Sequence, residues 1–461
     1  MERLSALDTE FLHLEDGVEH MVIAGMSVFG GTAPTEAEVQ ALLASKLHLI
    51  PRYRQRVRSV PLELGRPVWA DDPHFNLAYH VRTTALVEPA DDAALCRLMG
   101  RLMSQELDRN RPLWEAWIVH GLPGGCWALV SKVHHCMVDG VAGVGLLEAL
   151  LDVDPEVRPE EPRPWTPASE PSAPAMVADA WGGLLGDVAG RVRRLPGRVL
   201  DPVGTLRTIG TTGQGLIGFG RRLVSTPPLS IEGSIGPHRV WAHSSAALDD
   251  VRRIRKSLGG TVNDVVLAAV TSGYRELLRA RGEDVDHAVL RTLVPVSIRT
   301  EDARGVPDNR VSAMLCELPV DVADPVERLD SVKARMSELK ASHMIEAVGA
   351  VTSIGNLLPP MLVGNTTRAA VRLIRSRSQR SLNTVTTNVP GPQLPLYCLG
   401  REMLEHRPFV PISHGIRIAT AILSYNGVLA FGVTGDFDTA PDVGVVAEGI
   451  KAAIDELVDR A

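Results

Sequence analysis

The first 154 residues mix two spacings of apolar side chains. Three runs alternate or stay apolar over strand lengths, which is typical of half-buried and buried strands: residues 20–30, 115–122 and 126–135. Two others repeat apolar residues at the three- and four-residue spacing of a helix face: residues 93–107 and 143–153. Strands and helices mixed in this way predict one α/β unit that reaches to about residue 154.

A change of composition separates this unit from the rest of the chain. The sequence PEVRPEEPRPWTPASEPSAPA, residues 155–175, is dense in proline, glutamate and serine, and has too few apolar side chains to form its own core. Residues 176 to about 225 are rich in glycine, arginine and aliphatic side chains, without strand alternation. We therefore predict a linker over residues 155–235, which is proline-rich at the surface and then helical.

The α/β pattern resumes over residues 236–461. A helix is predicted from Thr261, where apolar residues recur at helical spacing up to Gly282. The remaining predicted elements are strands over 288–299, 310–320 and 381–392, a β-hairpin over 417–436 with a turn at Asn426–Gly427, and a closing helix over 441–460. Two α/β halves joined by a linker are the simplest architecture that fits this pattern.

Composition narrows the class of protein. A chain of 461 residues exceeds the size of a single hydrophobic core. A net charge of -7 gives no electrostatic reason to bind nucleic acid. The five cysteines form no C-x-x-C pair, which indicates reduced thiols in the cytoplasm. We expect neither a signal peptide nor a membrane span, because no apolar run reaches the required length.

Residues 132–143, KVHHCMVDGVAG, carry the strongest candidate chemistry. Metal binding by His134 and His135 is disfavoured, because neighbours on a strand point to opposite faces and no H-x-H or H-x-x-x-H spacing accompanies them. Acid–base catalysis needs only one imidazole, which titrates near neutral pH. The competing interpretations are a hydrogen-bonded packing histidine at 134 and a helix-capping aspartate at Asp139. A nucleophilic Cys136 is disfavoured, because on a strand its side chain would point away from His135.

These residues resemble a known motif. HHCMVDG, residues 134–140, fits the HHxxxDG pattern of CoA-dependent acyltransferases, with Gly140 as its last member. More of the chain is similar to the bacterial wax ester synthase/diacylglycerol acyltransferases, in that family's order: LSALDTEFLHLE (4–15), RPLWEAWIVHGL (111–122), GTVNDVVLAAV (260–270), LVPVSIR (293–299), TNVPGPQLPLYCLG (387–400) and SYNGVLAFGVTGD (424–436). Two positions depart from the family: His20–Met21 reverses its usual Met-His, and Ser230 replaces a common asparagine.

The resemblance implies a fold and a reaction. The fold is α/β, with two chloramphenicol-acetyltransferase-like domains (residues 1–154 and 236–461), mixed sheets and a central cleft or tunnel. The reaction is transfer of a long-chain acyl group from acyl-CoA to diacylglycerol, to a fatty alcohol or to both. No cofactor is implied beyond the acyl-CoA substrate. His135 would accept the proton of the alcohol as its oxygen attacks the thioester carbonyl, without an acyl-enzyme.

Further site residues follow from the same resemblance. Asn263 is a candidate donor to the oxyanion, with helix capping together with Asp264 as the alternative. Asn388 lies at a predicted strand end, where we expect it to shape the turn rather than to line the cleft. The resemblance also implies that Asp139 pairs with Arg299 and so ties the halves together, against the alternative of a solvated arginine.

Two other functions remain open at this stage. One is an acyltransferase of the same superfamily that is supplied by a carrier protein or associated with polyketide synthesis. The other is a non-catalytic lipid-coat protein that retains the fold, although an intact His135 and Asp139 argue against it. Assays with free acyl-CoA distinguish these functions from the leading one.

The expected substrates are lipids, so we expect the protein to bind the inner face of the membrane or a lipid droplet from the cytoplasm. Residues 347–400 contain no acid. Five arginines of this segment make it the first candidate for membrane contact: Arg368, Arg372, Arg375, Arg377 and Arg380. Residues 177–224, with Arg191, Arg193 and Arg194, are the second. The alternatives are a solvated basic face and one that meets the CoA phosphates.

Overall fold

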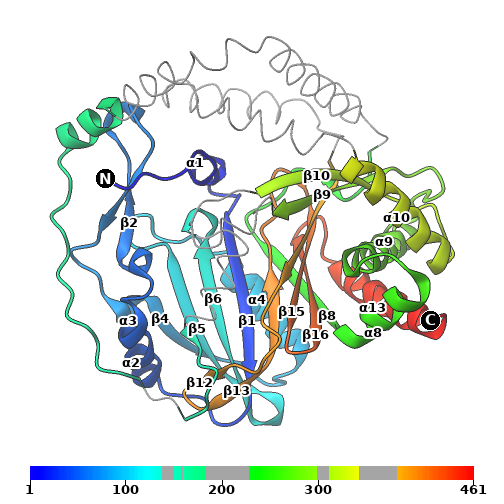
Figure 1. Ribbon diagram of the computed structural model, residues 1–461, viewed down its shortest axis with the longest axis horizontal. Coiled ribbons are helices and arrows are strands. Elements are labelled where there is room, and N and C mark those ends of the chain that lie inside the picture. The colour runs from blue at the N-terminus through cyan, green and yellow to red at the C-terminus, as the bar shows by residue number, and fades with distance from the viewer. Residues whose placement is uncertain (138–149, 157–158, 183–227, 298–310, 342–381) are drawn as a thin grey trace, which may run out of the picture.

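The computed structural model describes residues 1–137, 150–156, 159–182, 228–297, 311–341 and 382–461. In this part of the chain two six-stranded sheets lie side by side, with helices packed around them (Figure 1). Asp139, Gly140 and Arg299 lie outside the described residues, as do the five arginines of residues 368–380 and the three of residues 191–194. The predictions for them are therefore neither supported nor opposed by the structure.

The first sheet has the strand order β12-β13-β1-β6-β5-β4. Its strands are β1 (Val22–Phe29), β4 (Val81–Ala85), β5 (Trp114–Leu122), β6 (Cys126–His134), β12 (Tyr397–Cys398) and β13 (Arg401–Phe409). Only β4 and β5 pair in parallel, so the sheet is mixed. The surrounding helices are α1 (Ala6–Leu14), α2 (Glu36–Lys46), α3 (Leu77–His80) and α4 (Asp92–Met103), and β2 (Gln55–Arg58) forms a small separate sheet with β3 (Val68–Asp71).

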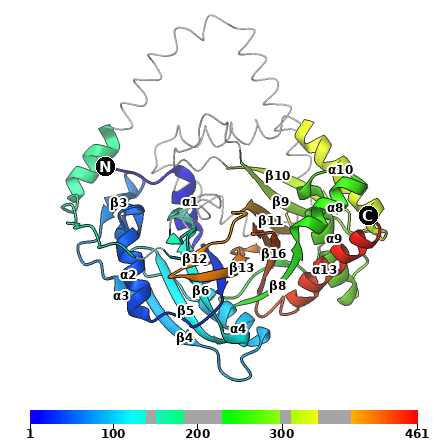
Figure 2. The same ribbon diagram turned by 60° about the horizontal axis from the view of Figure 1, so that its bottom comes forward.

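The second sheet has the order β10-β9-β11-β15-β16-β8. Its strands are β8 (Arg239–Ala247), β9 (Leu290–Ser297), β10 (Val311–Leu318), β11 (Thr384–Pro390), β15 (Ile418–Tyr425) and β16 (Val428–Asp436). Four helices lie together on one side of it (Figure 2): α8 (Leu248–Leu258), α9 (Val262–Ala280), α10 (Pro325–Ala341) and α13 (Val443–Asp459). The apolar faces of these helices and of the sheet form one continuous core, which is separate from the core of the first half.

The described chain also has short elements, besides helical residues 173–182. They are the 3₁₀ turns η1 (Pro51–Arg54), η2 (Pro61–Glu63), η3 (Pro123–Gly125) and η4 (His135–Met137), and the paired strands β7 (Glu232–Gly233) and β14 (Gly415–Ile416). Among the described helices, none combines the length and the apolar character needed to cross a bilayer.

The two halves meet along a seam that needs close backbone contact. Helix α4 reaches β8 because residue 100 is glycine: a Cβ there would lie 2.5 Å from the carbonyl oxygen of Arg239. Strand β13 reaches β16 in the same way, since a Cβ on Gly432 would lie 1.8 Å from the carbonyl oxygen of Pro408. Both distances are far below van der Waals contact, so any larger residue would force the halves apart.

The sheets divide the chain differently from the predicted boundaries. Residues 397–409 follow most of the second half in sequence, yet β12 and β13 belong to the first sheet, where β13 pairs with β1. The first sheet is therefore not confined to residues 1–154. Sequence patterning could not show this, because a strand's periodicity does not say which partner it pairs with.

Residues 159–182, most of which belong to the proline-rich stretch predicted as a surface linker, pack along the first half. Their contacts are a cation–π contact of Trp165 with Arg54 (4.5 Å), an ion pair of Glu170 with Arg58 (2.6 Å), and burial of Met176 against Val60 and Val68. Further along, Leu229 and Ile231 are buried in the second core. The described residues of the predicted linker thus pack against both halves of the molecule.

Candidate active site

The histidine pair lies where β6 ends against the turn η4. The strand stops at His134, and His135 begins the 3₁₀ turn. The His134 N–H donates to the carbonyl oxygen of Leu113 at 2.9 Å, and the His135 N–H donates to that of Met21 at 2.8 Å. The main chain at this point is thus fixed on both sides by the neighbouring chain segments.

The two imidazoles have different surroundings. His134 is fully buried, and its Nδ1 accepts a hydrogen bond from the Cys136 N–H at 3.1 Å. Its Nε2 faces the carboxylate of Glu15 at 3.4 Å. His135 is half-buried, and its ring stacks on Phe11 with the centroids 4.1 Å apart. His134 therefore packs in the protein interior, whereas His135 is only partly buried.

Glu15 is a charged neighbour of the pair that sequence analysis did not single out. Burial alone would raise its pKa, but the contacts with His134 and with Arg109 outweigh burial and lower the pKa to about 2. The carboxylate is therefore ionised throughout the neutral range. The only signal in the sequence was its place in the family segment LSALDTEFLHLE, which says nothing about its partner.

The nucleophile interpretation of Cys136 fits the structure poorly. The thiol is buried, and burial, together with the nearby carboxylates of Asp8 and Glu15, raises its pKa well above the ordinary range. Because the thiolate is the nucleophile, a thiol that keeps its proton at neutral pH cannot attack a thioester effectively.

The candidate amides of the second half lie together. Asn263 is in the first turn of α9, and Asn388 lies within β11. The Asn388 Nδ2 donates to the Asn263 Oδ1 at 3.3 Å, and both side chains are half-buried. Our expectation that Asn388 shapes a turn was wrong, because β11 continues through Pro390 and its side chain instead meets α9.

The start of α9 is capped by Thr261 and Asp264. Thr261 is the N-cap, and it forms a reciprocal capping box with Asp264, whose N–H donates to the threonine hydroxyl at 3.2 Å. The carboxylate of Asp264 in turn accepts the Thr261 N–H at 2.8 Å. Asp264 therefore holds the helix end, and the Asn263 side chain instead contacts Asn388.

Trp114, from the segment RPLWEAWIVHGL, is part of the core. It is only 2% exposed, its Nε1 donates to the Tyr53 carbonyl oxygen at 2.9 Å, and its ring stacks on His80 at 4.5 Å. It also borders a small apolar cavity between α2 and the first sheet, together with Leu129 and Val133 of β6. Trp114 thus belongs to the hydrophobic core and to the wall of this cavity.

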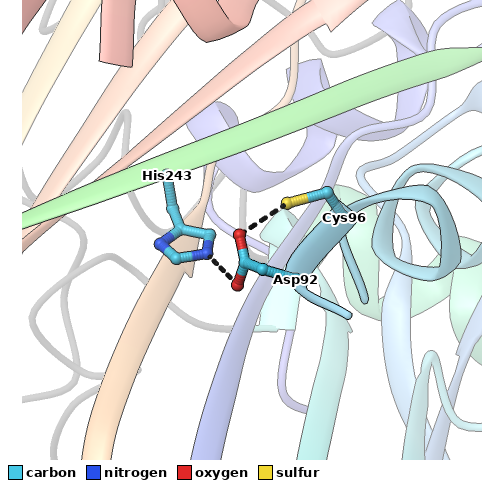
Figure 3. Close-up of side chains that lie close together, drawn as sticks. All are labelled: Asp92, Cys96 and His243. Carbon is cyan, nitrogen blue, oxygen red and sulfur yellow. Dashed lines mark hydrogen bonds and ion pairs between the residues drawn. The ribbon is translucent and has the colours of Figure 1, made fainter. Parts of the chain in front are cut away.

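One cluster in the described residues has the composition of a metal site. A carboxylate oxygen of Asp92, the Sγ of Cys96 and a ring nitrogen of His243 lie within 4.8 Å of one another (Figure 3). The guanidinium of Arg407 lies 3.2 Å from Asp92 and 3.0 Å from His243, where it already supplies positive charge. Burial also raises the pKa of Cys96 to about 12, which disfavours a thiolate ligand. We interpret the cluster as an ionic contact between the halves.

Comparison with known proteins identifies matching families and relatives. The catalytic domain of wax ester synthase/diacylglycerol acyltransferase matches residues 4–266, and the family's C-terminal domain matches residues 308–458. A probable diacylglycerol O-acyltransferase of Mycobacterium tuberculosis is 37% identical over 99% of this chain and 96% of its own length. A putative diacylglycerol O-acyltransferase of the same organism is 31% identical over 100% and 98%.

Solved structures agree in fold. The wax ester synthase/diacylglycerol acyltransferase from Marinobacter aquaeolei has a TM-score of 0.70 at 26% identity, covering 99% of this chain and 98% of that chain. The first condensation domain of the calcium-dependent antibiotic synthetase has a TM-score of 0.62 at 17% identity, covering 99% and 96%, and so bears on the fold alone. The predicted two-domain α/β fold with mixed sheets is confirmed.

Proposed function

The chain belongs to the wax ester synthase/diacylglycerol acyltransferase family, and from this premise we propose that it transfers a long-chain acyl group from acyl-CoA to the hydroxyl of diacylglycerol. The observation that carries the proposal is the 37% identity over 99% of the chain to a probable diacylglycerol O-acyltransferase. The half-buried His135, fixed at the end of β6, is consistent with that chemistry.

His135 acts as the general base in the proposed reaction. Its imidazole accepts the hydroxyl proton while the alcohol oxygen forms a bond to the thioester carbonyl carbon. The tetrahedral adduct then collapses, the C–S bond breaks, and the imidazolium returns the proton to the CoA thiolate. The products are the ester and free CoA, so proton and charge balance without a covalent enzyme intermediate.

The amide pair stabilises the oxyanion of the tetrahedral adduct. The Asn388 Nδ2 uses one of its hydrogens on the Asn263 Oδ1, which fixes the orientation of the Asn263 amide. The Asn263 Nδ2 is therefore the donor that the pair offers to a substrate oxygen. A neutral donor fixed in advance stabilises developing negative charge without reorganisation.

A fatty alcohol is the second candidate acceptor, supported by the similarity to the wax ester synthase of Marinobacter aquaeolei. The discriminating experiment gives the purified protein one long-chain acyl-CoA with a diacylglycerol or with hexadecanol, and follows thiol release and lipid product. Triacylglycerol formation supports the proposal, and wax ester formation alone assigns the second acceptor. Thiol release only in the presence of an acylated carrier protein would contradict both.

We further propose that the protein reaches its lipid substrate by binding reversibly to a membrane or lipid-droplet surface. The support is the lipid acceptor, together with the absence of a spanning helix among the described residues. Flotation with anionic vesicles at low and high salt tests this, with binding expected at low salt. Failure to float with either anionic or neutral vesicles would contradict it.

A further inference from the structure

Helix α1 contacts both histidines with one face. Phe11 lies in α1, and Glu15, four residues later, is the residue that caps its C-terminal end, which puts the two side chains on the same side of the helix. Phe11 stacks on the ring of His135, and Glu15 faces the Nε2 of His134 at 3.4 Å. Neighbouring residues at a strand end point in different directions, so a helix that lies across that end is well placed to hold both rings (Figure 1).

Arg109 fixes the end of this helix. Its Nε and Nη2 lie 3.0 and 2.7 Å from the same carboxylate oxygen of Glu15. Its Nη2 also donates to the Leu12 carbonyl oxygen at 3.1 Å, one of the carbonyls left open at a helix end. The Glu15 side chain is 5% exposed and that of Arg109 is 49% exposed, so the arginine links a buried charge to the surface.

His134 connects Glu15 to the turn that carries His135. Its Nδ1 accepts the N–H of Cys136, the second residue of η4. An acceptor Nδ1 places the proton of the neutral ring on Nε2, the nitrogen that faces Glu15. The contacts of the His134 ring, with the Cys136 N–H on one side and the Glu15 carboxylate on the other, thus connect the turn to Glu15.

We propose that Glu15 and Arg109 are positioning residues of acyl transfer, which hold the His135 imidazole through His134 and through the Phe11 stack. This inference rests on the proposed function, and neither residue is required to exchange a proton with substrate. A misplacement of about 1 Å at a reacting group costs up to about 100-fold in rate, so a displaced turn lowers kcat without changing substrate binding.

The kinetic test compares Glu15→Gln and Arg109→Gln with the parent. Glutamine keeps the shape of Glu15 and removes its charge. We expect kcat to fall about 10- to 100-fold in each variant, with the KM values for acyl-CoA and acceptor unchanged. The kcat of the double variant should fall no further than that of the worse single variant, because both residues act through the same contact of Glu15 with His134. Parental kcat in either single variant, or a loss confined to KM, would overturn the inference.

Arg97→Gln is the matched control. Arg97 has a 69% exposed side chain, and its contact with Asp91 is 4.0 Å long, so the control removes a guanidinium from the same half without touching α1. We expect parental kcat and KM from it. An equal fall in kcat for Arg97→Gln and Arg109→Gln would mean that the loss reflects charge alone, and would overturn the positioning role.

A second readout does not depend on turnover. Diethyl pyrocarbonate modifies accessible imidazoles, and peptide mass mapping gives the rate at His135 separately from the other histidines. We expect faster modification of His135 in Glu15→Gln and Arg109→Gln than in the parent, because the stack on Phe11 loosens. An unchanged rate of His135 modification in the variants would overturn the inference, whether or not the parent protein transfers acyl groups. A parent protein that transfers no acyl group would contradict only the proposed function.

Discussion

The two halves of the molecule hold their candidate residues in opposite ways. In the first half, His134 and His135 are fixed by main-chain hydrogen bonds of 2.9 and 2.8 Å, and charged side chains stand behind them. In the second half, Asn263 and Asn388 are neutral, half-buried and joined by a single hydrogen bond of 3.3 Å. Among the described residues, the histidine pair thus has an ionised carboxylate behind it, whereas the amide pair is held by a contact between neutral groups.

This difference matches the demands of the two tasks. A proton is transferred over a short distance only, so the base must be held within a few tenths of an ångström of its working position. An oxyanion donor must be polar and oriented in advance, but it neither gains nor loses a proton during the reaction. The comparison predicts that changes in the first half alter the rate most, and that changes in the second half alter rate and helix stability together.

His135→Ala should have the largest effect. Removing the general base should lower kcat about 10²- to 10⁴-fold, while thermal unfolding stays near that of the parent, because the ring is only half-buried. Steady-state acyl transfer and calorimetry measure the two quantities. His287→Ala, with its 86% exposed side chain, is the control. An alanine variant with parental kcat would remove His135 from the reaction.

Asn263→Ala should come next. Loss of an oxyanion donor costs about 10²- to 10³-fold in kcat, with little change in the KM for acyl-CoA. Asn388→Ala should lose less, because it removes the partner that orients the donor rather than the donor itself. A larger loss in Asn388→Ala than in Asn263→Ala would reverse the assignment of the two amides.

Thr261→Ala should act mainly on stability. The substitution removes the N-cap of α9 and breaks the capping box with Asp264, which should lower the free energy of unfolding by about 1 kcal/mol. Because Asn263 follows two residues later, we expect a modest fall in kcat as well. Denaturant unfolding measures the first effect, and an unchanged midpoint would show that the cap contributes nothing.

Asp92→Asn should have the smallest effect, and it depends on pH. The hydrogen bond with His243, aided by Arg407, lowers the pKa of Asp92 below its ordinary value. Because the pKa of Asp92 is lower in the folded protein than in the unfolded chain, where it is about 3.9, the ionised carboxylate stabilises the fold at every pH above that unfolded pKa. This contribution is lost as the pH falls through the pKa of the folded protein. The side chain is 61% exposed, so the gain is about 1 kcal/mol or less. Unfolding midpoints of parent and variant should differ at pH 6 and converge below pH 4.

Elements with a clear period were predictable from the sequence. The helix expected from Thr261 is present as α9, and the hairpin turns at Asn426–Gly427, where both residues have positive φ as a two-residue turn requires. The motif also singled out the histidine pair as a candidate, and the structure adds the different surroundings of the two rings. Local patterns sufficed here because each depends on residues that are close in the chain.

Features that depend on distant partners were not predictable. The contact of Glu15 with His134 joins residues that are far apart in sequence, and that between Asn263 and Asn388 joins two elements of the second half. The position of the proline-rich segment likewise depends on contacts with other elements, such as the cation–π contact of Arg54 with Trp165. Periodicity reports which face of an element is buried, but not what covers it.

The return of β13 to the first sheet has a consequence for how the chain is made. During synthesis the first sheet stays incomplete until residues 401–409 leave the ribosome, so β1 remains an open edge while most of the second half is being translated. Pairing across such a long stretch of chain slows folding. A gene cut between the halves would yield an amino-terminal fragment in which β1 lacks its partner β13, and this fragment would be prone to aggregate. The two halves must therefore be encoded as a single chain.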